Sequence, residues 1–93
     1  MIIKEKELNK IIKKNFHLKT ILLELDGIVE GHIFFVKAVC KYNYTEGILY
    51  IFDLLNNIRI NLISQYKMEY EEKEKIIIIN LDNGQDIKIK VLE

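Results

Sequence analysis

Two histidines, His17 and His32, and a single cysteine, Cys40, are the residues best suited to metal binding or nucleophilic chemistry. Neither histidine has a second histidine, a cysteine or a carboxylate at metal-ligand spacing, so no metal site is predicted. Cys40 follows Val39 in an alternating apolar stretch, which predicts a buried and unreactive thiol. Ser64 likewise has no neighbouring base in the sequence.

The carboxylates add no second catalytic pattern. Glu24, Glu30 and Asp53 stand singly on predicted strands, so an acid–base pair would have to be assembled by folding. A phosphate-binding loop needs glycines that open a helix, and none of the four glycines precedes one. We therefore expect a protein that is not an enzyme and has no catalytic residues and no cofactor.

Tyrosines gather towards one end of the predicted central strands, beside an acidic loop. Tyrosine combines a large rigid contact surface with a polar tip and is enriched at protein interfaces. The residues predicted to bind a partner are Tyr44, Tyr66, Tyr70, Glu71, Glu72 and Glu74. Tyr44 and Tyr70 are expected to be exposed because they border loops. The alternative for Tyr50 and Tyr66 is that they close one end of the core.

The N-terminal end of the chain is basic. Six lysines and two glutamates give the first twenty residues a local charge of +4, although the whole chain has net charge zero. Lys10, Lys13 and Lys14 are candidates for contact with nucleic acid or with an acidic protein. The alternative is that they form the solvated face of a helix that packs on its other side.

Composition indicates one globular domain over residues 1–93. Apolar residues make up 49% of the chain and charged residues 30%, a balance typical of globular proteins. A chain of this length forms a core without disulfides or metal. No apolar run approaches the ~20 residues of a membrane helix, and the charged residues at 4–7 are unlike a signal peptide, so a cytosolic location is expected.

Residues 1–15 are predicted to form the helical region, with the helix itself over residues 3–15. Leu8, Ile11 and Ile12 recur at helical spacing and would form one apolar stripe on a lysine-rich surface. The remaining residues, 16–92, are predicted to form an antiparallel β meander.

Alternating apolar residues over positions 48–70 predict two long antiparallel strands around which the rest of the chain is arranged. A three-residue turn at 55–57 would oppose Phe52 with Ile60. Even-numbered residues from 34 to 68 would then share one interior.

The hairpin before this pair is predicted from two glycines and an aspartate. Asp26-Gly27 predicts a two-residue turn between strands at 16–25 and 28–41, and Gly31 predicts a bulge. That turn would place His32 opposite Ile21. A five-residue loop at 43–47 would then place Cys40 opposite Tyr50.

The last hairpin carries the clearest turn signal in the chain. Asp82-Asn83-Gly84 predicts a three-residue turn that ends in a left-handed glycine. The expected pairs are Ile79 with Ile87, Ile77 with Ile89, and Asn80 with Asp86. The predicted fold is therefore α+β, with an N-terminal helix on a curved antiparallel sheet of about six strands, open or closed as a small barrel.

One segment of 14 residues, 47–60, contains Gly47, the aromatic–Asp pair Phe52-Asp53 and the step Asn57-Ile58. This spacing resembles the first signature of the Sm-like RNA-binding proteins. The resemblance implies a small bent barrel behind an N-terminal helix, in ring oligomers that bind uridine-rich RNA. It also implies that Asp53 and Asn57 lie at the base pocket.

The expected function is that of a non-catalytic binding module that acts through protein–protein contact. Such small modules include adaptors and inhibitors, some of them carried by mobile elements. We expect self-association through an Ile-rich surface or a free strand edge, and no membrane partner. The alternative is a small-barrel protein that binds RNA or another single-stranded nucleic acid. Its contacts would be Lys10, Lys13, Lys14, Asp53 and Asn57.

Overall fold

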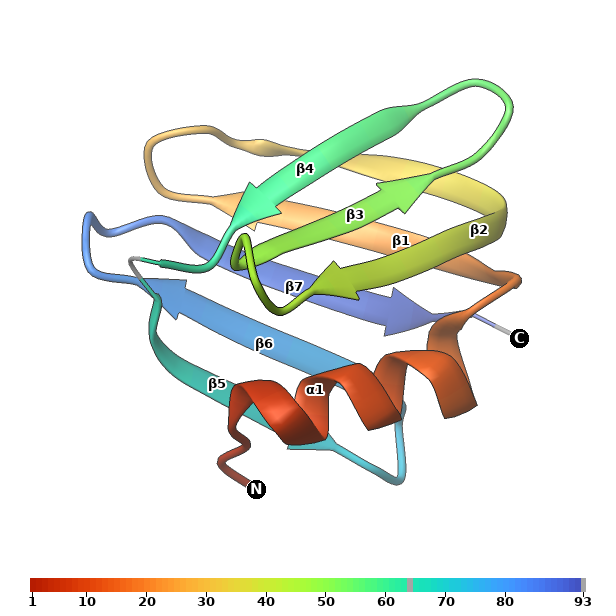
Figure 1. Cartoon of the computed structure of the whole chain (residues 1–93). Coiled ribbons are helices and arrows are strands. Elements are labelled where there is room, and N and C mark those ends of the chain that lie inside the picture. Colours follow the sequence, from red (N-terminus) through yellow and green to blue (C-terminus); the bar gives the residue numbers. More distant parts are fainter. Residues whose placement is uncertain (64, 93) are drawn as a thin grey trace.

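A helical segment at the N-terminus packs on a curved antiparallel sheet (Figure 1). The computed structural model describes residues 1–63 and 65–92, without the side chains of residues 65 and 66. In this part of the chain the elements are α1 (Glu5–Ile11), η1 (Ile12–Phe16), β1 (Lys19–Asp26), β2 (Gly31–Asn43), β3 (Ile48–Phe52), β4 (Asn57–Asn61), β5 (Gln65–Glu71), β6 (Ile76–Leu81) and β7 (Asp86–Val91). The predicted α+β class is confirmed, with seven strands.

The helical segment is shorter at its start than predicted and changes its winding at its end. It begins at Glu5 because Ile3 is already engaged with the sheet, where its N–H donates to the Met68 carbonyl at 2.9 Å. The last turn, η1, is π-helical. Leu8, Ile12 and Phe16 are buried at intervals of four residues, so one apolar stripe holds both parts against the sheet.

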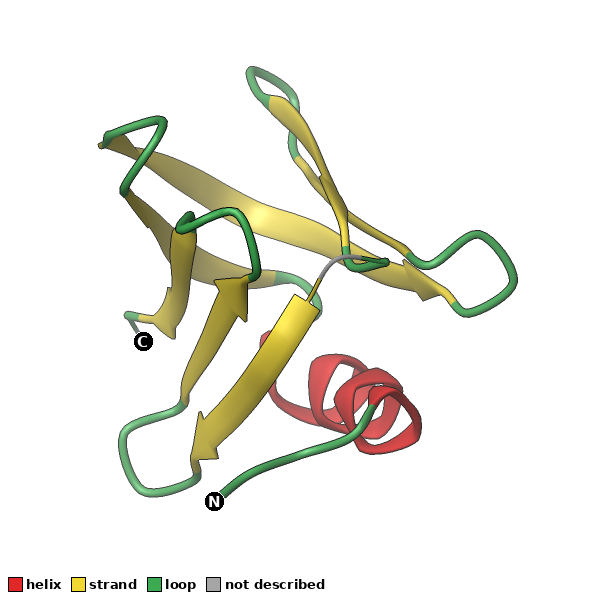
Figure 2. Ribbon diagram, turned by 90° about the vertical axis from the view of Figure 1, so that its left-hand side faces the viewer, coloured by secondary structure: helices red, strands yellow, loops and turns green. Residues whose placement is uncertain are grey.

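The strands follow the order β4-β3-β2-β1-β7-β6-β5, and all neighbours are antiparallel. The stretch predicted as one strand over residues 58–70 is therefore two strands. Its first half, β4, pairs with β3, and its second half, β5, pairs with β6 at the other end of the sheet. The sheet curls strongly, but β4 and β5 are its two edges, so it is open rather than closed as a barrel (Figure 2).

The inward-pointing side chains of β3 are the opposite of those predicted. Leu49 and Ile51 are buried, whereas Tyr50 and Phe52 are only partly covered. Cys40 pairs with Ile51 instead of Tyr50. Both loops beside β3 have four residues, where five and three were predicted. A one-residue change of register turns every side chain of a strand to the other face, and the predicted even-numbered interior is wrong for β3.

Short polar side chains explain the length of these two loops. Asn43 Oδ1 accepts the N–H of Glu46 at 3.1 Å. Asp53 Oδ1 accepts the N–H groups of Leu55 and Asn56 at 2.8 and 2.7 Å. In such turns the first residue closes the loop with its own side chain, and this local geometry set the register against the hydrophobic alternation.

The loop between β1 and β2 has four residues, 27–30, and is not the predicted two-residue turn at Asp26-Gly27. A side chain from a distant hairpin supports it. Gln85 Nε2 donates to the carbonyls of Asp26 and Val29 at 3.0 and 2.9 Å, and its Oε1 accepts the N–H of Val29 at 2.7 Å. The four-residue loop is therefore stabilised by a side chain that lies 56 and 59 positions from its partners in the sequence.

A bulge in β2 changes which side chains in the first half of the strand point towards the core. It was predicted at Gly31, but the irregularity lies where β2 passes the start of β1, and Lys37 there has φ 52°. Phe35 is consequently buried, whereas Phe34 and Val36 are exposed. The prediction that Phe34 and Val36 point inwards is wrong, because the bulge inserts a residue and shifts the alternation.

The last hairpin has the predicted register. The observed pairs are Ile79 with Ile87, Ile77 with Ile89, and Asn80 with Asp86. Gly84 has φ 93°, the left-handed value that the three-residue turn requires. Here every signal was local, and the prediction is confirmed.

Candidate functional site

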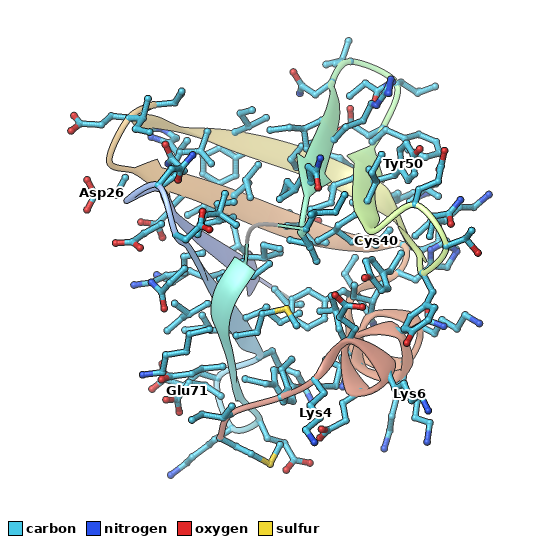
Figure 3. The ribbon with its side chains drawn as sticks, turned by 60° about the vertical axis from the view of Figure 1, so that its left-hand side comes forward. Lys4, Lys6, Asp26, Cys40, Tyr50 and Glu71 are labelled. Carbon is cyan, nitrogen blue, oxygen red and sulfur yellow. The ribbon has the colours of Figure 1, made fainter. Side chains whose placement is uncertain are left out.

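Of the residues with the greatest chemical reactivity, His17 lies beside the backbone of Cys40, whereas His32 lies on another part of β2. Cys40 is buried between sheet and helix, and burial raises the pKa of its thiol to about 12, so the thiol stays protonated (Figure 3). His17 Nδ1 accepts the N–H of Cys40 at 3.4 Å. His32 is exposed and lies opposite Glu24 rather than the predicted Ile21. Ser64 lies outside the described residues.

No group of three histidine, cysteine, aspartate or glutamate side chains in the described residues could hold a metal ion. Over the same residues, no helix has the length and apolar character needed to span a membrane.

The predicted tyrosine surface is divided in the structure. Tyr44 is exposed, as expected, and its ring meets the edge of Tyr42 near the start of α1. Tyr70 was expected to be exposed but is buried, with its hydroxyl accepting the Asn15 side-chain N–H at 3.1 Å. Its ring packs beside Phe16. The side chain of Tyr66 lies outside the described residues.

The acidic residues lie at the other end of the helical segment from Tyr44. Glu71 is exposed at the end of β5, and Glu72 and Glu74 are exposed in the turn between β5 and β6. The next residue, Lys75, donates to the side chain of Asn15 at 3.2 Å, which places this turn beside the end of the helix. About ten helical residues, roughly 15 Å, separate that end from the start of α1. The structure therefore does not bring these acids next to Tyr44.

The residues proposed for nucleic acid are also dispersed. Lys10, Lys13 and Lys14 are exposed on the helical segment, whereas Asn57 is exposed at the start of β4. Asp53 directs both carboxylate oxygens at backbone N–H groups of its own chain. RNA binding stays a prediction, and the positions of these residues do not indicate where RNA would bind.

A set of exposed apolar residues, here called the apolar tip, lies where the β3–β4 loop is hydrogen-bonded to β2. It consists of Phe34, Val36, Leu54 and Leu55, all of them exposed. The relative exposures of Leu54 and Leu55 are 103% and 90%, so neither contacts the core. Large apolar side chains gathered on a surface are typical of contact sites for other molecules.

Asp53 holds the apolar tip in one shape. Its Oδ2 accepts the Val36 N–H at 2.9 Å, while Oδ1 accepts two N–H groups within the loop. Asn56 adds a bond from its side chain to the Phe34 carbonyl at 3.2 Å. Two hydrogen bonds thus hold the loop against β2, and the loop presents its leucines in one conformation. An aspartate three residues before an asparagine was the available sequence signal for this turn.

We expect Asp53 to make stability depend on pH. Backbone N–H groups of Val36, Asn56 and Leu55 hold the pKa of its carboxyl below the ordinary value. The ionised form thus contributes stability above about pH 4, and this contribution is lost as pH falls through the lowered pKa. Urea denaturation at neutral and acid pH should show a smaller acid loss in Asp53→Asn than in the wild type. Equal acid losses in the two proteins would contradict this role.

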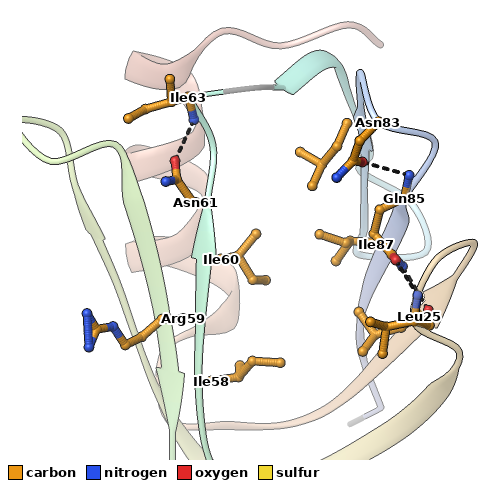
Figure 4. A pocket seen from close by; sticks show the side chains of 11 residues that line it. Leu25, Ile58, Arg59, Ile60, Asn61, Ile63, Asn83, Gln85 and Ile87 are labelled. Carbon is orange, nitrogen blue, oxygen red and sulfur yellow. Dashed lines mark hydrogen bonds between the residues drawn. The ribbon is translucent and has the colours of Figure 1, made fainter.

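A second surface feature is an apolar groove beside β4, where the curled sheet fails to close (Figure 4). Its volume is about 490 Å³. One wall is formed by Ile58 and Ile60 of β4, and the other includes Leu25 and Ile87.

The far wall of the groove is held by Gln85, which is buried. Asn83 Oδ1 accepts the Gln85 N–H at 3.0 Å, and the Gln85 side chain binds the β1–β2 loop. No sequence pattern identified this role of Gln85, because its partners are 56 and 59 positions away.

Comparison of the chain with protein-family models, with curated proteins and with solved structures found no match.

Proposed function

We propose that this chain is a non-catalytic protein-binding module, acting as an adaptor or inhibitor, that self-associates through the apolar tip. The observation that carries the proposal is the full exposure of Leu54 and Leu55 on a loop held by Asp53. A loop that is already ordered loses little conformational entropy on contact, so its apolar side chains contribute to association more effectively.

A second copy of the chain is the occupant that best fits the apolar tip. The four side chains of the tip carry no charge, so two copies can meet there without opposing like charges. Both oxygens of Asp53, the adjoining acidic residue, are already engaged with backbone N–H groups. Four side chains from each copy cover much less than the ~1,600 Å² of a standard interface, and a weak dimer is expected.

Sedimentation velocity tests this self-association. We expect wild-type protein to shift from monomer to dimer with a Kd of about 10–1,000 µM. Serine at both Leu54 and Leu55 should weaken the dimer more than tenfold, because four leucine side chains leave the contact. The control carries serine at Ile28 and Leu92, which are also exposed but lie outside the tip. A wild type that stays monomeric throughout, or a control that dissociates equally, would refute the tip contact.

A further inference from the structure

The free edge of the sheet runs beside the apolar groove, and together they have the form of a binding site for an extended segment of another protein (Figure 4). We propose that β4 accepts such a segment as an added strand with an apolar–acidic–apolar sequence, the acidic side chain lying opposite Arg59. This surface is distinct from the apolar tip, and the inference goes beyond self-association.

Of the two sheet edges, the chain covers β5 with its own N-terminus. The Ile3 N–H donates to the Met68 carbonyl at 2.9 Å, and the Tyr70 N–H donates to the Met1 carbonyl at 2.8 Å. A bridge between Ile2 and Glu69 lies between these bonds. No described strand pairs with the outer side of β4. An edge left open in this way is a template for another strand.

The hydrogen-bonding groups of β4 alternate between its two sides. The Leu62 N–H donates to the Gly47 carbonyl at 2.8 Å, which fixes the phase of the β3–β4 ladder. Since opposed pairs in an antiparallel ladder are bonded alternately, even-numbered residues of β4 bond to β3. The N–H and C=O groups of Asn57, Arg59 and Asn61 therefore point towards the open edge.

Two side chains of β4 line the groove, and a strand added at the edge of β4 would also direct side chains into it. Ile58 and Ile60 point inwards, towards Leu25 and Ile87 on the opposite wall (Figure 4). In an added strand, the residues on either side of the one opposite Arg59 would point inwards as well, because successive side chains alternate. Those two positions would fill the groove and so require apolar side chains.

Charge distinguishes a partner segment from a second copy of β4. Arg59 is the only charged residue among the described residues that line the groove, and its guanidinium carbon lies 5.8 Å from the centre of the Tyr50 ring. Opposite charges on facing strands are favourable, whereas like charges are not. Two copies of β4 would place the two Arg59 side chains opposite or diagonal to each other. An acidic residue in a partner segment complements Arg59 instead.

NMR titration of backbone amides tests the proposal with a blocked peptide, Thr-Val-Glu-Val-Thr, and its lysine-centred analogue. We expect saturable shifts along β4 and at Ile87, with the glutamate peptide binding roughly fivefold more tightly than the lysine peptide. Arg59→Glu should reverse this preference. The control, Lys73→Glu in the exposed β5–β6 turn, carries the same charge change and should keep it.

A second pair of variants tests the backbone contact independently of charge. Asn61→Pro removes one outward N–H at a position where an edge strand tolerates proline, and it should abolish the shifts. Asn61→Ala loses the same side chain but keeps the N–H, so it measures the effect of the side chain alone, and the shifts along β4 should persist in it. The proposal is overturned if neither peptide binds, or if Arg59→Glu keeps the wild-type preference. It is also overturned if the amide shifts occur at Ile87 but not along β4 regardless of peptide charge, or if β4 amides shift with protein concentration alone.

Discussion

Replacement of Phe35 by alanine is expected to lower the free energy of unfolding by about 3–5 kcal/mol, because a fully buried aromatic ring leaves a cavity that the core fills only partly. Domains of this size have a total stability of about 5–15 kcal/mol, so the variant should be close to unfolding. Urea denaturation followed by circular dichroism measures the change from the shift of the midpoint.

The neighbouring phenylalanine is the matched control for this prediction. Phe34 is 53% exposed and has a ring contact with His32 at 5.9 Å, so Phe34→Ala should cost less than about 1 kcal/mol. The two variants remove the same atoms from adjacent positions on opposite faces of β2. If Phe34→Ala proved the more damaging of the two, the register of β2 described above would be wrong.

The second large effect is expected for Gln85, the buried polar residue that joins two hairpins. Gln85→Leu keeps a similar volume but removes the acceptor for the Val29 N–H and the donors to three carbonyls, those of Asp26, Val29 and Asp86. Leaving such groups without partners should cost about 2–4 kcal/mol in total. Urea denaturation gives this cost, and hydrogen exchange should show faster exchange of the Val29 amide.

Two further variants separate hydrogen bonding from packing at this position. Gln85→Glu keeps the acceptor but turns the donors into an oxygen that faces three carbonyls, so it should also be destabilising. Asp82→Asn changes an exposed residue of the same turn and should leave stability within about 0.5 kcal/mol of the wild type. A Gln85→Leu protein as stable as Asp82→Asn would show that the side chain is not needed to hold the β1–β2 loop.

The parts of the fold that were predictable were those specified by neighbouring residues. The turn at Asp82-Asn83-Gly84 needs a left-handed glycine, and the isoleucines on either side alternate in a register that only one loop length satisfies. The N-terminal helix was likewise indicated by Leu8 and Ile12 at helical spacing. The N-terminal helix, the antiparallel sheet and the last hairpin followed from these local signals.

The candidate sites were much less predictable, because their residues come together from distant parts of the chain. Tyr70 borders a charged turn in the sequence, yet it lies under the helix with Asn15 as its partner. The apolar tip joins Leu54 and Leu55 to β2 through Asp53, and alternation alone had assigned Leu54 to the core. Exposure of these leucines follows from the fold and is not visible in their residue types.

Side-chain type and spacing were sufficient to establish which segments become strands and which becomes the helix, since period and turn chemistry act over a few residues. They were not sufficient to establish which face of β2 and β3 points inwards, where residues 58–70 divide, or which edge stays open. An apolar stretch such as Ile48-Leu49-Tyr50-Ile51-Phe52 offers two nearly equal faces to a core. The choice between them depends on one residue of loop length. Asn43 and Asp53 each accept an N–H from a residue two or three positions ahead, but several loop lengths are compatible with the apolar alternation. The second carboxylate oxygen of Asp53 accepts the N–H of Val36 on β2, a contact that exists only in the folded chain.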